Sequence, residues 1–514
     1  MENRVPAVKL TDISKRFGSV AANSHVNMEV YRGEILALLG ENGSGKTTLM
    51  NMLSGIYYPD EGEIAIDGKT VTIASPRDAF DLGIGMVHQH FKLVDVLTAA
   101  ENIVLGLDGK LDLKNATKKI NEICSKYGFE VNPSQKIYDM SVSQKQTVEI
   151  VKVLFRGAEI LILDEPTAVL TPQETEKLFD VLRRMRDDNK AIVIITHKMH
   201  EVESLSDRVA VLRKGEYIGD MMTKDTNAEE MTNMMVGRKV SLNIKRPEPV
   251  DPKDRIRVTG LNVRSEEGIL KLKDVSFTAK SGEILGIAGI SGCGQKELLE
   301  AIAGLQPVES GSIEYIEDDG SSEQLIGKDP RSIRDMGVSL SFVPEDRLGM
   351  GLVGNMNLAD NMMLRSFEKG GSPFTDRKAP YELAKSVVEE LEVVTPGIST
   401  PVRRLSGGNV QKVLVGREIA SAPKVLLTAY AVRGLDINSS YTIYDLINKQ
   451  KQAGVAVIFV GEDLDVLMEL SDRILVLCGG EVSGIVDGRK ADRAQIGLMM
   501  TKTGNNTEGG KINE

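Results

Sequence analysis

Two glycine-rich segments with the spacing of a phosphate-binding loop lie about 250 residues apart in this chain, and one of them has lost its lysine. Residues 40–47 read Gly-Glu-Asn-Gly-Ser-Gly-Lys-Thr and fit the pattern G-x-x-x-x-G-K-[ST]. In such a loop, backbone N–H groups surround nucleotide phosphates at a helix start, the lysine reaches the β and γ phosphates, and the next hydroxyl binds Mg²⁺. Residues 289–296 keep the glycines but have Gln295 at the lysine position.

An acidic pair follows a run of apolar residues in the first half of the chain. Asp164 and Glu165 come directly after Ile160–Leu163, which has the composition of a buried strand. An aspartate at the carboxyl end of such a strand, beside the loop, suits Mg²⁺ coordination together with Thr47, and Glu165 can polarise the attacking water. An isolated Asp-Glu pair after a strand is usually a turn; the complete loop at 40–47 favours the catalytic interpretation.

Three further residues gain meaning from this set. His197 and Gln89 each follow a short apolar strand and could reach the γ phosphate or, for Gln89, the metal. Phe17 could stack on adenine, with a core aromatic as the alternative; a lone histidine or glutamine at such positions is more often structural. The predicted nucleotide contacts of the first half are Phe17, Gly40, Glu41, Asn42, Gly43, Ser44, Gly45, Lys46, Thr47 and Thr48. The predicted catalytic residues are Lys46, Gln89, Glu165 and His197, and the predicted Mg²⁺ ligands are Thr47, Gln89 and Asp164.

The elements that position these residues recur in both halves. Residues 31–64 and 280–313 share a pattern of strand, glycine loop, helix and turn before a new strand. Continuous apolar runs, such as Ala191–Ile195, are typical of a parallel sheet that helices cover on both faces. Residues 110–155 and 377–420 are charged and predicted to be helical. The sequence therefore predicts an α/β fold that is present twice.

The order of these motifs resembles that of ABC-transporter ATPase domains. The resemblance covers about residues 7–500 and implies two tandem P-loop ATPase domains. Each would have a RecA-like parallel-sheet core, an antiparallel β subdomain and a helical subdomain. We predict a first domain at 1–240, a linker at 241–257, a second domain at 258–500 and a disordered tail at 501–514.

The two halves differ in which motifs of that family they keep. The second half has an intact signature, Leu405–Gln411, whose predicted nucleotide contacts are Ser406, Gly407, Gly408 and Gln411. The first half has Ser143 where the second signature glycine would stand. The other motifs of the second half are degenerate, with Gln295, Glu345, Ala429, Tyr430 and Glu462 replacing the loop lysine, the loop glutamine, the Mg²⁺ aspartate, the catalytic glutamate and the switch histidine.

In this family the two domains pair head to tail, so that each ATP site joins the P-loop of one domain to the signature of the other. Under that arrangement the intact motifs of both halves meet in one site and the degenerate motifs meet in the other. Independent decay would not sort the motifs in this way. The resemblance thus implies one hydrolytic site, with ATP and Mg²⁺ as its ligands.

Fused tandem ATPases with a degenerate second half resemble the ATP-binding subunits of monosaccharide and nucleoside importers. Residues 343–347 and 404–412 are similar to that group, and residues 85–106 are more similar to its nucleoside branch. The absence of Pro-Thr after Tyr430 departs from the group. The resemblance implies two transmembrane permease subunits, an extracytoplasmic solute-binding protein, and a peripheral location at the cytoplasmic face of the membrane. Phe91, Leu93 and Val96 are candidate permease contacts, with packing of the helical subdomain as the alternative.

Composition and charge weigh against other classes. The chain has a net charge of −11, which does not favour a nucleic-acid binder, and its three scattered cysteines do not suggest a disulfide framework or a zinc module. We expect no signal peptide, because the first residues lack an apolar core. A tandem ATPase acting on the ribosome remains the alternative, although that class keeps two competent sites and a long charged linker, and here residues 245–255 are short and proline-bearing.

Overall fold

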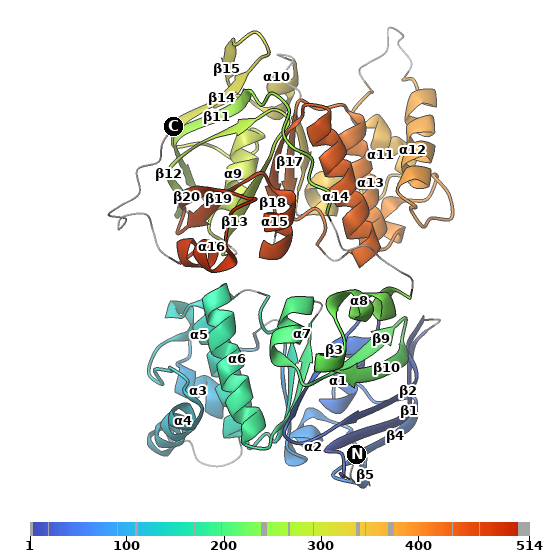
Figure 1. Cartoon of the computed structure of the whole chain (residues 1–514), viewed down its shortest axis with the longest axis vertical. Helices are drawn as coiled ribbons and strands as arrows, with labels where there is room; N and C mark the ends of the chain where they lie inside the picture. The colour runs from blue at the N-terminus through green and yellow to red at the C-terminus, as the bar shows by residue number, and fades with distance from the viewer. Residues whose placement is uncertain are drawn as a thin grey trace. The chain divides into compact units, whose positions relative to one another are not determined.

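The chain divides into two compact units, Met1–Ser241 and Leu242–Glu514, here called the first and second halves (Figure 1). The structure, a computed structural model, describes residues 4–18, 20–89, 91–107, 112–168, 170–196, 198–237, 244–265, 268–290, 292–335, 340–344, 346–367, 375–433, 435–461 and 463–501. The predicted tail therefore lies outside the described residues except for Thr501.

Two sheets form the first half. The larger has the order β10-β9-β3-β8-β7-β6, in which β9, β3, β8, β7 and β6 run parallel, and the smaller is antiparallel with the order β2-β1-β4-β5. Their bounds are β1 Val8–Phe17, β2 Val20–Val30, β3 Glu34–Leu39, β4 Glu61–Ile66, β5 Lys69–Val71, β6 Ile84–Val87, β7 Ile160–Asp164, β8 Ala191–Ile195, β9 Arg208–Arg213 and β10 Glu216–Met222.

Some of the helices of the first half form a separate helical subdomain. The helical subdomain holds α3, α4, η1 and α5, on the side away from the antiparallel strands in Figure 1. The bounds are α1 Lys46–Leu53, α2 Pro76–Asp81, α3 Ala99–Val104, α4 Leu113–Tyr127, η1 Ile137–Asp139, α5 Val142–Phe155, α6 Pro172–Asp187, α7 Met199–Leu205, η2 Thr223–Asp225 and α8 Ala228–Val236.

The second half repeats this topology. Its larger sheet, β16-β17-β18-β13-β19-β20, and its antiparallel sheet, β12-β11-β14-β15, have the same connectivity as those of the first half. The strands are β11 Asp254–Arg264, β12 Leu270–Lys280, β13 Ile284–Gly289, β14 Ser310–Ile316, β15 Ser322–Gln324, β16 Leu340–Val343, β17 Val425–Ala429, β18 Ala456–Val460, β19 Arg473–Cys478 and β20 Glu481–Asp487. The helices are α9 Gln295–Ile302, α10 Pro330–Asp335, η3 Arg347–Gly351, α11 Leu358–Met363, α12 Lys378–Glu390, η4 Val402–Arg404, α13 Gly407–Ala420, α14 Ile437–Gln452, α15 Leu464–Leu470 and α16 Arg493–Met499.

The central strands are buried on both faces, which explains their continuous apolar sequences. In β7, Ile160 and Ile162 pack in a cluster with residues of the antiparallel sheet and α1, whereas Leu161 and Leu163 pack in a cluster with α5 and α6. Successive side chains of a strand point to opposite faces, so each strand supplies both layers. The predicted α/β fold, with its RecA-like cores, antiparallel sheets and helical subdomains, is confirmed in both halves.

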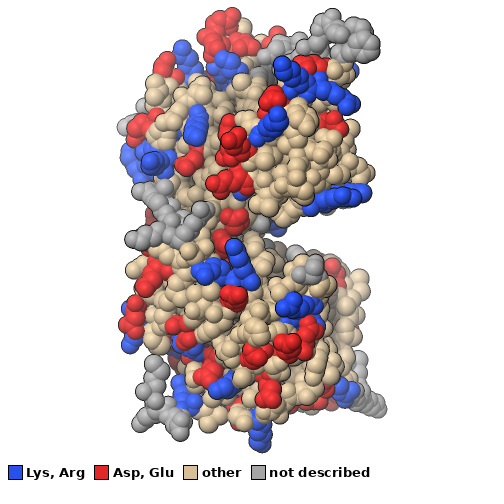
Figure 2. All heavy atoms as spheres, turned by 90° about the vertical axis from the view of Figure 1, so that its right-hand side faces the viewer, with Lys and Arg blue, Asp and Glu red and all other residues tan. Residues whose placement is uncertain are grey.

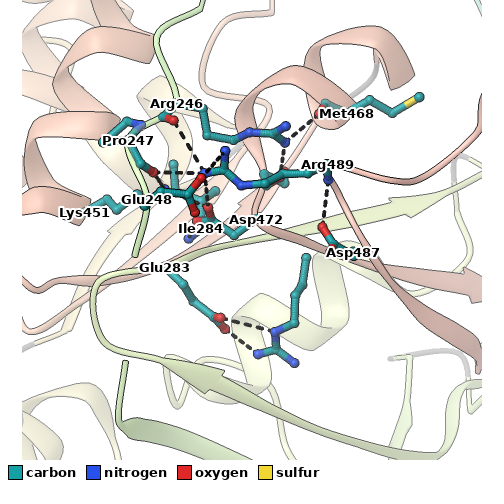
Figure 3. Close-up of polar contacts among 12 residues, drawn as sticks. Arg246, Pro247, Glu248, Glu283, Ile284, Lys451, Met468, Asp472, Asp487 and Arg489 are labelled. Carbon is teal, nitrogen blue, oxygen red and sulfur yellow. Dashed lines mark hydrogen bonds and ion pairs between the residues drawn. The ribbon is translucent and has the colours of Figure 1, made fainter. Parts of the chain in front are cut away.

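The proline-bearing segment at the start of the second half is bound to the rest of that half (Figure 3). Arg246 donates to the backbone oxygens of Met468 at 2.8 Å and Ser471 at 2.6 Å. The backbone oxygen of Pro247 accepts hydrogen bonds from Lys451 and Arg489. Strand β11 begins at Asp254, inside the range predicted as a linker, so the predicted linker of 241–257 extends too far into the second half.

Asp472 is the centre of this network. Its carboxylate lies 2.7 Å from the Nζ of Lys451 and accepts a hydrogen bond from the backbone N–H of Ile284 at 2.9 Å. The two charged side chains are only 1% and 6% exposed. A buried ammonium that loses its partner carboxylate destabilises the fold. We therefore expect a large loss of stability when one member of the pair is removed.

We predict that Asp472→Ala lowers the stability of the second half by about 3–5 kcal/mol, because it leaves the buried ammonium of Lys451 without its carboxylate. Differential scanning calorimetry of the full chain would show this as a lower midpoint for one of its transitions. Glu382→Ala, which breaks an ion pair with Lys385 whose side chains are 62% and 54% exposed, is the control. It is expected to cost less than about 1 kcal/mol. Equal effects of the two variants would contradict the prediction.

Candidate functional site

The functional residues of the first half lie at one edge of its larger sheet. Strands β3, β8, β7 and β6 run parallel, so their carboxyl ends share an edge. The loop at 40–45 follows β3, Thr196 follows β8, Asp164 ends β7, and Gln89 lies two residues beyond β6. The sheet therefore brings together residues that are up to 156 positions apart in the sequence.

Close backbone packing explains the last glycine of the loop. Gly45 has a φ of 96°, a left-handed conformation that side chains disfavour. A Cβ at this position would lie 2.2 Å from the backbone oxygen of Ala22, which is too close for any side chain. The side chain of Asn23 donates to the backbone oxygen of Gly45 at 3.3 Å. Ala22 and Asn23 belong to β2, so this strand of the antiparallel sheet holds the loop against the start of α1.

Lys46 is directed into the loop. Its ammonium donates to the backbone oxygens of Gly40 at 2.7 Å and Glu41 at 2.9 Å, and the residue is only 7% exposed. Burial lowers the pKa of Lys46, while the nearby carboxylates of Glu165 and Asp164 oppose that shift. The ammonium is therefore held inside the loop by backbone oxygens, at the position where it could also meet the phosphate oxygens of a nucleotide.

Thr47 and Asp164 meet as expected for a metal site. The Thr47 hydroxyl donates to Asp164 Oδ2 at 3.3 Å, and Asp164 is 7% exposed. Burial, followed by the charge of Glu165, raises the pKa of Asp164. A buried carboxylate beside a hydroxyl, with its negative charge incompletely compensated, fits a Mg²⁺ ion whose other ligands are phosphates and waters.

Glu165 adopts an unusual backbone conformation that directs it toward Gln89. Its φ is 48°, and its N–H donates to the backbone oxygen of Ile195 at 2.9 Å. The amide of Gln89 donates to Glu165 Oε2 at 2.9 Å. The structure therefore brings Gln89 together with the carboxylate predicted to act as the base.

Of the other residues predicted from the sequence, three lie outside the described ranges and one is exposed. His197, Glu345 and Glu462 lie outside the described residues. Phe17 is 45% exposed and its ring lies 5.2 Å from that of Tyr57, so the alternative of a core aromatic is wrong. The adenine-stacking role of Phe17 stays a prediction.

Glu201 is a buried residue that sequence reasoning missed. Its carboxylate accepts hydrogen bonds from the hydroxyls of Thr167 at 2.5 Å and Thr196 at 3.0 Å. It also lies 3.1 Å from the Nζ of Lys198 and is 4% exposed. Glu201 thus ties the segment after Asp164-Glu165 to the residues on both sides of position 197. An acidic residue in the first turn of the helix after β8 was the available signal.

The second half keeps the backbone of this site without its charged groups. The Gln295 amide donates to the backbone oxygen of Ile290 at 3.1 Å, as Lys46 does to the corresponding Glu41 oxygen. Tyr430 has a φ of 53° and donates its N–H to the backbone oxygen of Val460 at 2.9 Å, which matches Glu165. Ala429, at the position of Asp164, is buried and has no ligand atom in its side chain. The backbone contacts are thus shared by the two halves, whereas at these positions the charged side chains are present in the first half alone.

The two signature segments each begin a helix. Ser406 caps α13 and also accepts a hydrogen bond from the side chain of Asn409 at 2.8 Å, and both Ser406 and Gly407 are exposed. Ser141 caps α5 in the same way. Gln411 is 1% exposed, on the inner face of α13, and its role as a nucleotide contact stays a prediction.

Comparison with known proteins identifies the family. The sequence pattern described as "ABC transporter" matches residues 23–168 and 272–428, which together make up more than half of the chain. The chain belongs to the ABC transporter family. It carries two of that family's ATP-binding domains in tandem, and it is an ATPase.

Its relatives match over almost the full length of this ABC ATPase. It is 42% identical to the nucleoside import ATP-binding protein of Lactococcus lactis subsp. cremoris, over 99% of both chains. It is 40% identical to the guanosine import ATP-binding protein of Bacillus subtilis, over 98% of this chain and 99% of that one. It is also 40% identical to the glucose import ATP-binding protein of Haloferax volcanii, over 98% and 97%.

A solved structure shares the tandem fold. The archaeal ribosome recycling factor, in complex with a ribosomal stalk protein, matches 90% of this chain and 87% of its own, with a TM-score of 0.58 and 18% identity. At this identity the match shows the fold alone.

We predict that Asp164→Asn raises the thermal midpoint of the nucleotide-free first half at pH 7 and abolishes Mg²⁺-dependent ATP hydrolysis. Because the pKa of Asp164 is raised in the folded chain, stability falls as the pH rises from the ordinary Asp pKa of about 3.9 through the raised value. The ionised carboxylate thus destabilises the fold at neutral pH, and the amide removes that penalty. Calorimetry at pH 7 and in mild acid measures the difference, which should shrink in acid.

The control for this prediction is Asp81→Asn, which changes an exposed carboxylate at the end of α2. It is expected to move the midpoint less and to leave hydrolysis intact. A lower thermal midpoint for Asp164→Asn at pH 7 would contradict the expectation that the buried, ionised carboxylate destabilises the folded first half.

Proposed function

We propose that this chain is the ATP-hydrolysing subunit of an ABC importer, and that the imported solute is a nucleoside rather than a simple sugar. The observation that carries the proposal is the full-length similarity to ATP-binding proteins of nucleoside and guanosine import, at 42% and 40% identity. The motif segment at 85–106 also resembles the nucleoside branch. The 40% identical relative named for glucose import keeps a sugar as the alternative solute.

We further propose that each chain has one hydrolytic site, made of the first-half P-loop motifs and the second-half signature. The support is the sorting of intact and degenerate motifs between the halves. In the first half Lys46 contacts the loop backbone, Asp164 contacts Thr47 and Glu165 contacts Gln89. The second half has Gln295, Ala429 and Tyr430 at the positions of Lys46, Asp164 and Glu165. The signature with both glycines belongs to the second half, and its Ser406 and Gly407 are exposed and available for a phosphate.

The residues of the first half divide the chemistry of hydrolysis. Lys46 and the loop amides bind the phosphates, and Thr47 and Asp164 bind Mg²⁺, with Gln89 as a further ligand. Glu165 orients and polarises the attacking water, and Gln89, which donates to its carboxylate, holds that group in place. Phe17, exposed on β1, stacks on the adenine. His197 senses the γ phosphate.

The importer role implies partners in the membrane. None of the helices in the described ranges is both long and apolar enough to cross a bilayer. We therefore propose that two permease subunits hold the chain at the cytoplasmic face and that a solute-binding protein delivers the solute outside. Of the candidate permease contacts, Val96 is 68% exposed, whereas Leu93 packs against the core of the helical subdomain, which favours a structural role for Leu93.

A translation factor is the weaker alternative. The similarity to the ribosome recycling factor extends only to the fold. On the face shown in Figure 2, acidic and basic side chains are interspersed, without the continuous basic surface that ribosomal RNA binding favours. The segment between the halves is also held to the second half rather than forming a long charged helix.

We predict that Ser406→Arg abolishes ATP hydrolysis by the full chain, because a bulky cation would block the signature that completes the site. Ser141→Arg is the matched control: each change removes a helix cap, which costs about 1 kcal/mol, but Ser141 belongs to the degenerate site. The hydrolysis rate of both variants should be compared with that of Glu165→Gln, whose rate should fall by about 10²–10⁴-fold. Equal loss in the two arginine variants would exclude a single hydrolytic site.

We predict that cells in which Glu165→Gln replaces the natural chain lose uptake of radiolabelled guanosine and keep uptake of ribose and glucose. The variant still binds ATP but cannot drive transport. Loss of sugar uptake with normal guanosine uptake would assign the importer to a sugar. Normal uptake of all three solutes, combined with co-sedimentation of the chain with ribosomes, would favour the translation factor.

A further inference from the structure

The loop after β16 makes an unusual contact with the start of the signature helix. In the second half, Arg347 donates through Nη1 to the backbone oxygen of Gly407 at 3.1 Å. Through Nη2 it donates to the backbone oxygen of Arg433, in the segment after β17. A single guanidinium thus joins three segments that are far apart in sequence: the loop after β16, the signature, and the segment after the degenerate Mg²⁺ position.

The turn that carries Arg347 is itself fixed at both ends. Residues Arg347–Gly351 form a short π-helical turn, and Asp346 caps it by accepting the N–H of Gly349 at 2.8 Å. At the other end, Arg417 of α13 donates to the backbone oxygen of Gly351 at 2.7 Å. Arg417 is in turn paired with Glu418, which is fully buried. The turn therefore lies along α13, with Arg347 at the first residue of that helix.

This arrangement is specific to the half with the intact signature. Counting from the last residue of the preceding strand, Phe91 occupies the position of Arg347 in the first half, and phenylalanine cannot donate hydrogen bonds. The loop from Val343 to Asn357 is also three residues longer than its counterpart from Val87 to Thr98. Both halves share the backbone bonds that join this loop to the segment before the signature, such as Val402 to Met356 and Ile137 to Leu97.

Arg347 brings a cation to the start of α13, where electrostatics oppose it. The N-terminal turn of a helix already carries a partial positive charge, so a cation there is unfavourable and increases the attraction for an anion. Contact with Gly407 is also close, since a Cβ on that glycine would lie 3.3 Å from Nη1 of Arg347. The planar guanidinium presents its donors in a fixed plane, so Arg347 can reach two carbonyls on separate segments in one geometry, which the freely rotating ammonium of a lysine does not define.

We propose that Arg347 is a positioning residue for ATP hydrolysis. It holds Gly407 to the segment around Arg433 and so fixes the orientation in which Ser406 and the first N–H groups of α13 meet a γ phosphate. The proposal rests on the single composite site proposed above. It also gives a reason why the loop after β16 differs from the loop after β6. The loop after β16 has Glu345 at the position of the loop glutamine and Arg347 two residues later, where it orders the signature.

The test is the steady-state ATPase activity of the full chain with Arg347→Ala and Arg347→Lys. We expect Arg347→Ala to lower kcat about tenfold or more, because small misplacements of a group that stabilises the transition state are costly. The KM for ATP should change less than about threefold, since the P-loop that binds ATP is in the first half. Arg347→Lys should fall between the alanine variant and the natural chain.

Two further variants separate positioning from loss of structure. Arg403→Ala removes an exposed arginine side chain three residues before Ser406 and leaves the contacts of Arg347 in place, and it should retain kcat. Ser406→Ala combined with Arg347→Ala should lose less than the product of the two single effects if Arg347 acts through the signature. Thermal midpoints of all variants identify any that are unfolded.

Each outcome bears on a separate claim. If Ser406→Arg is fully active, the composite site itself is wrong. If Ser406→Arg is inactive but folded Arg347→Ala keeps the natural kcat, the role of Arg347 alone is overturned. A rise in KM without a fall in kcat, or fully multiplicative effects in the double variant, would overturn it as well.

Discussion

The hydrogen-bonded register between the parallel strands β7 and β8 is the constraint on which the ATP site depends. It places Asp164 level with Ile195, and the backbone of Glu165 then bonds to that residue as the chain turns into a left-handed conformation. Since β3 pairs with β8 on its other side, the loop that holds Lys46 opens at the same edge. The residues proposed to bind phosphate, bind the metal and activate water are thereby gathered from segments that are far apart in sequence.

The second half shows that this backbone arrangement is independent of its chemistry. Ala429 is level with Val460 in the same register, Tyr430 repeats the left-handed turn, and Gln295 replaces the loop contact of the lysine with a neutral amide. A left-handed non-glycine residue is a strained choice, typical of functional sites, and it persists here where no carboxylate remains. The surrounding sheet therefore holds this turn in place even where no carboxylate follows the strand.

Much of this could be predicted from sequence because the signals are local. The loop at 40–47, the apolar runs of β7 and β8 and the helical segments each lie within a few tens of residues, and the structure confirms the fold that they indicate. The contacts of Arg347, Glu201 and Asp472 could not be predicted, because their partners are distant in sequence and chosen by tertiary packing. The burial of Gln411 could not be predicted from its motif, because a motif names residues without their helical face.

The side chain of Lys46 also closes the loop on itself, because it joins the last turn of the loop to the backbone oxygens of Gly40 and Glu41 at its start. Removing the ammonium would therefore loosen the backbone of the loop as well as remove a cation. A neutral amide of similar reach separates these two properties, since Gln295 keeps a contact across its own loop and carries no charge.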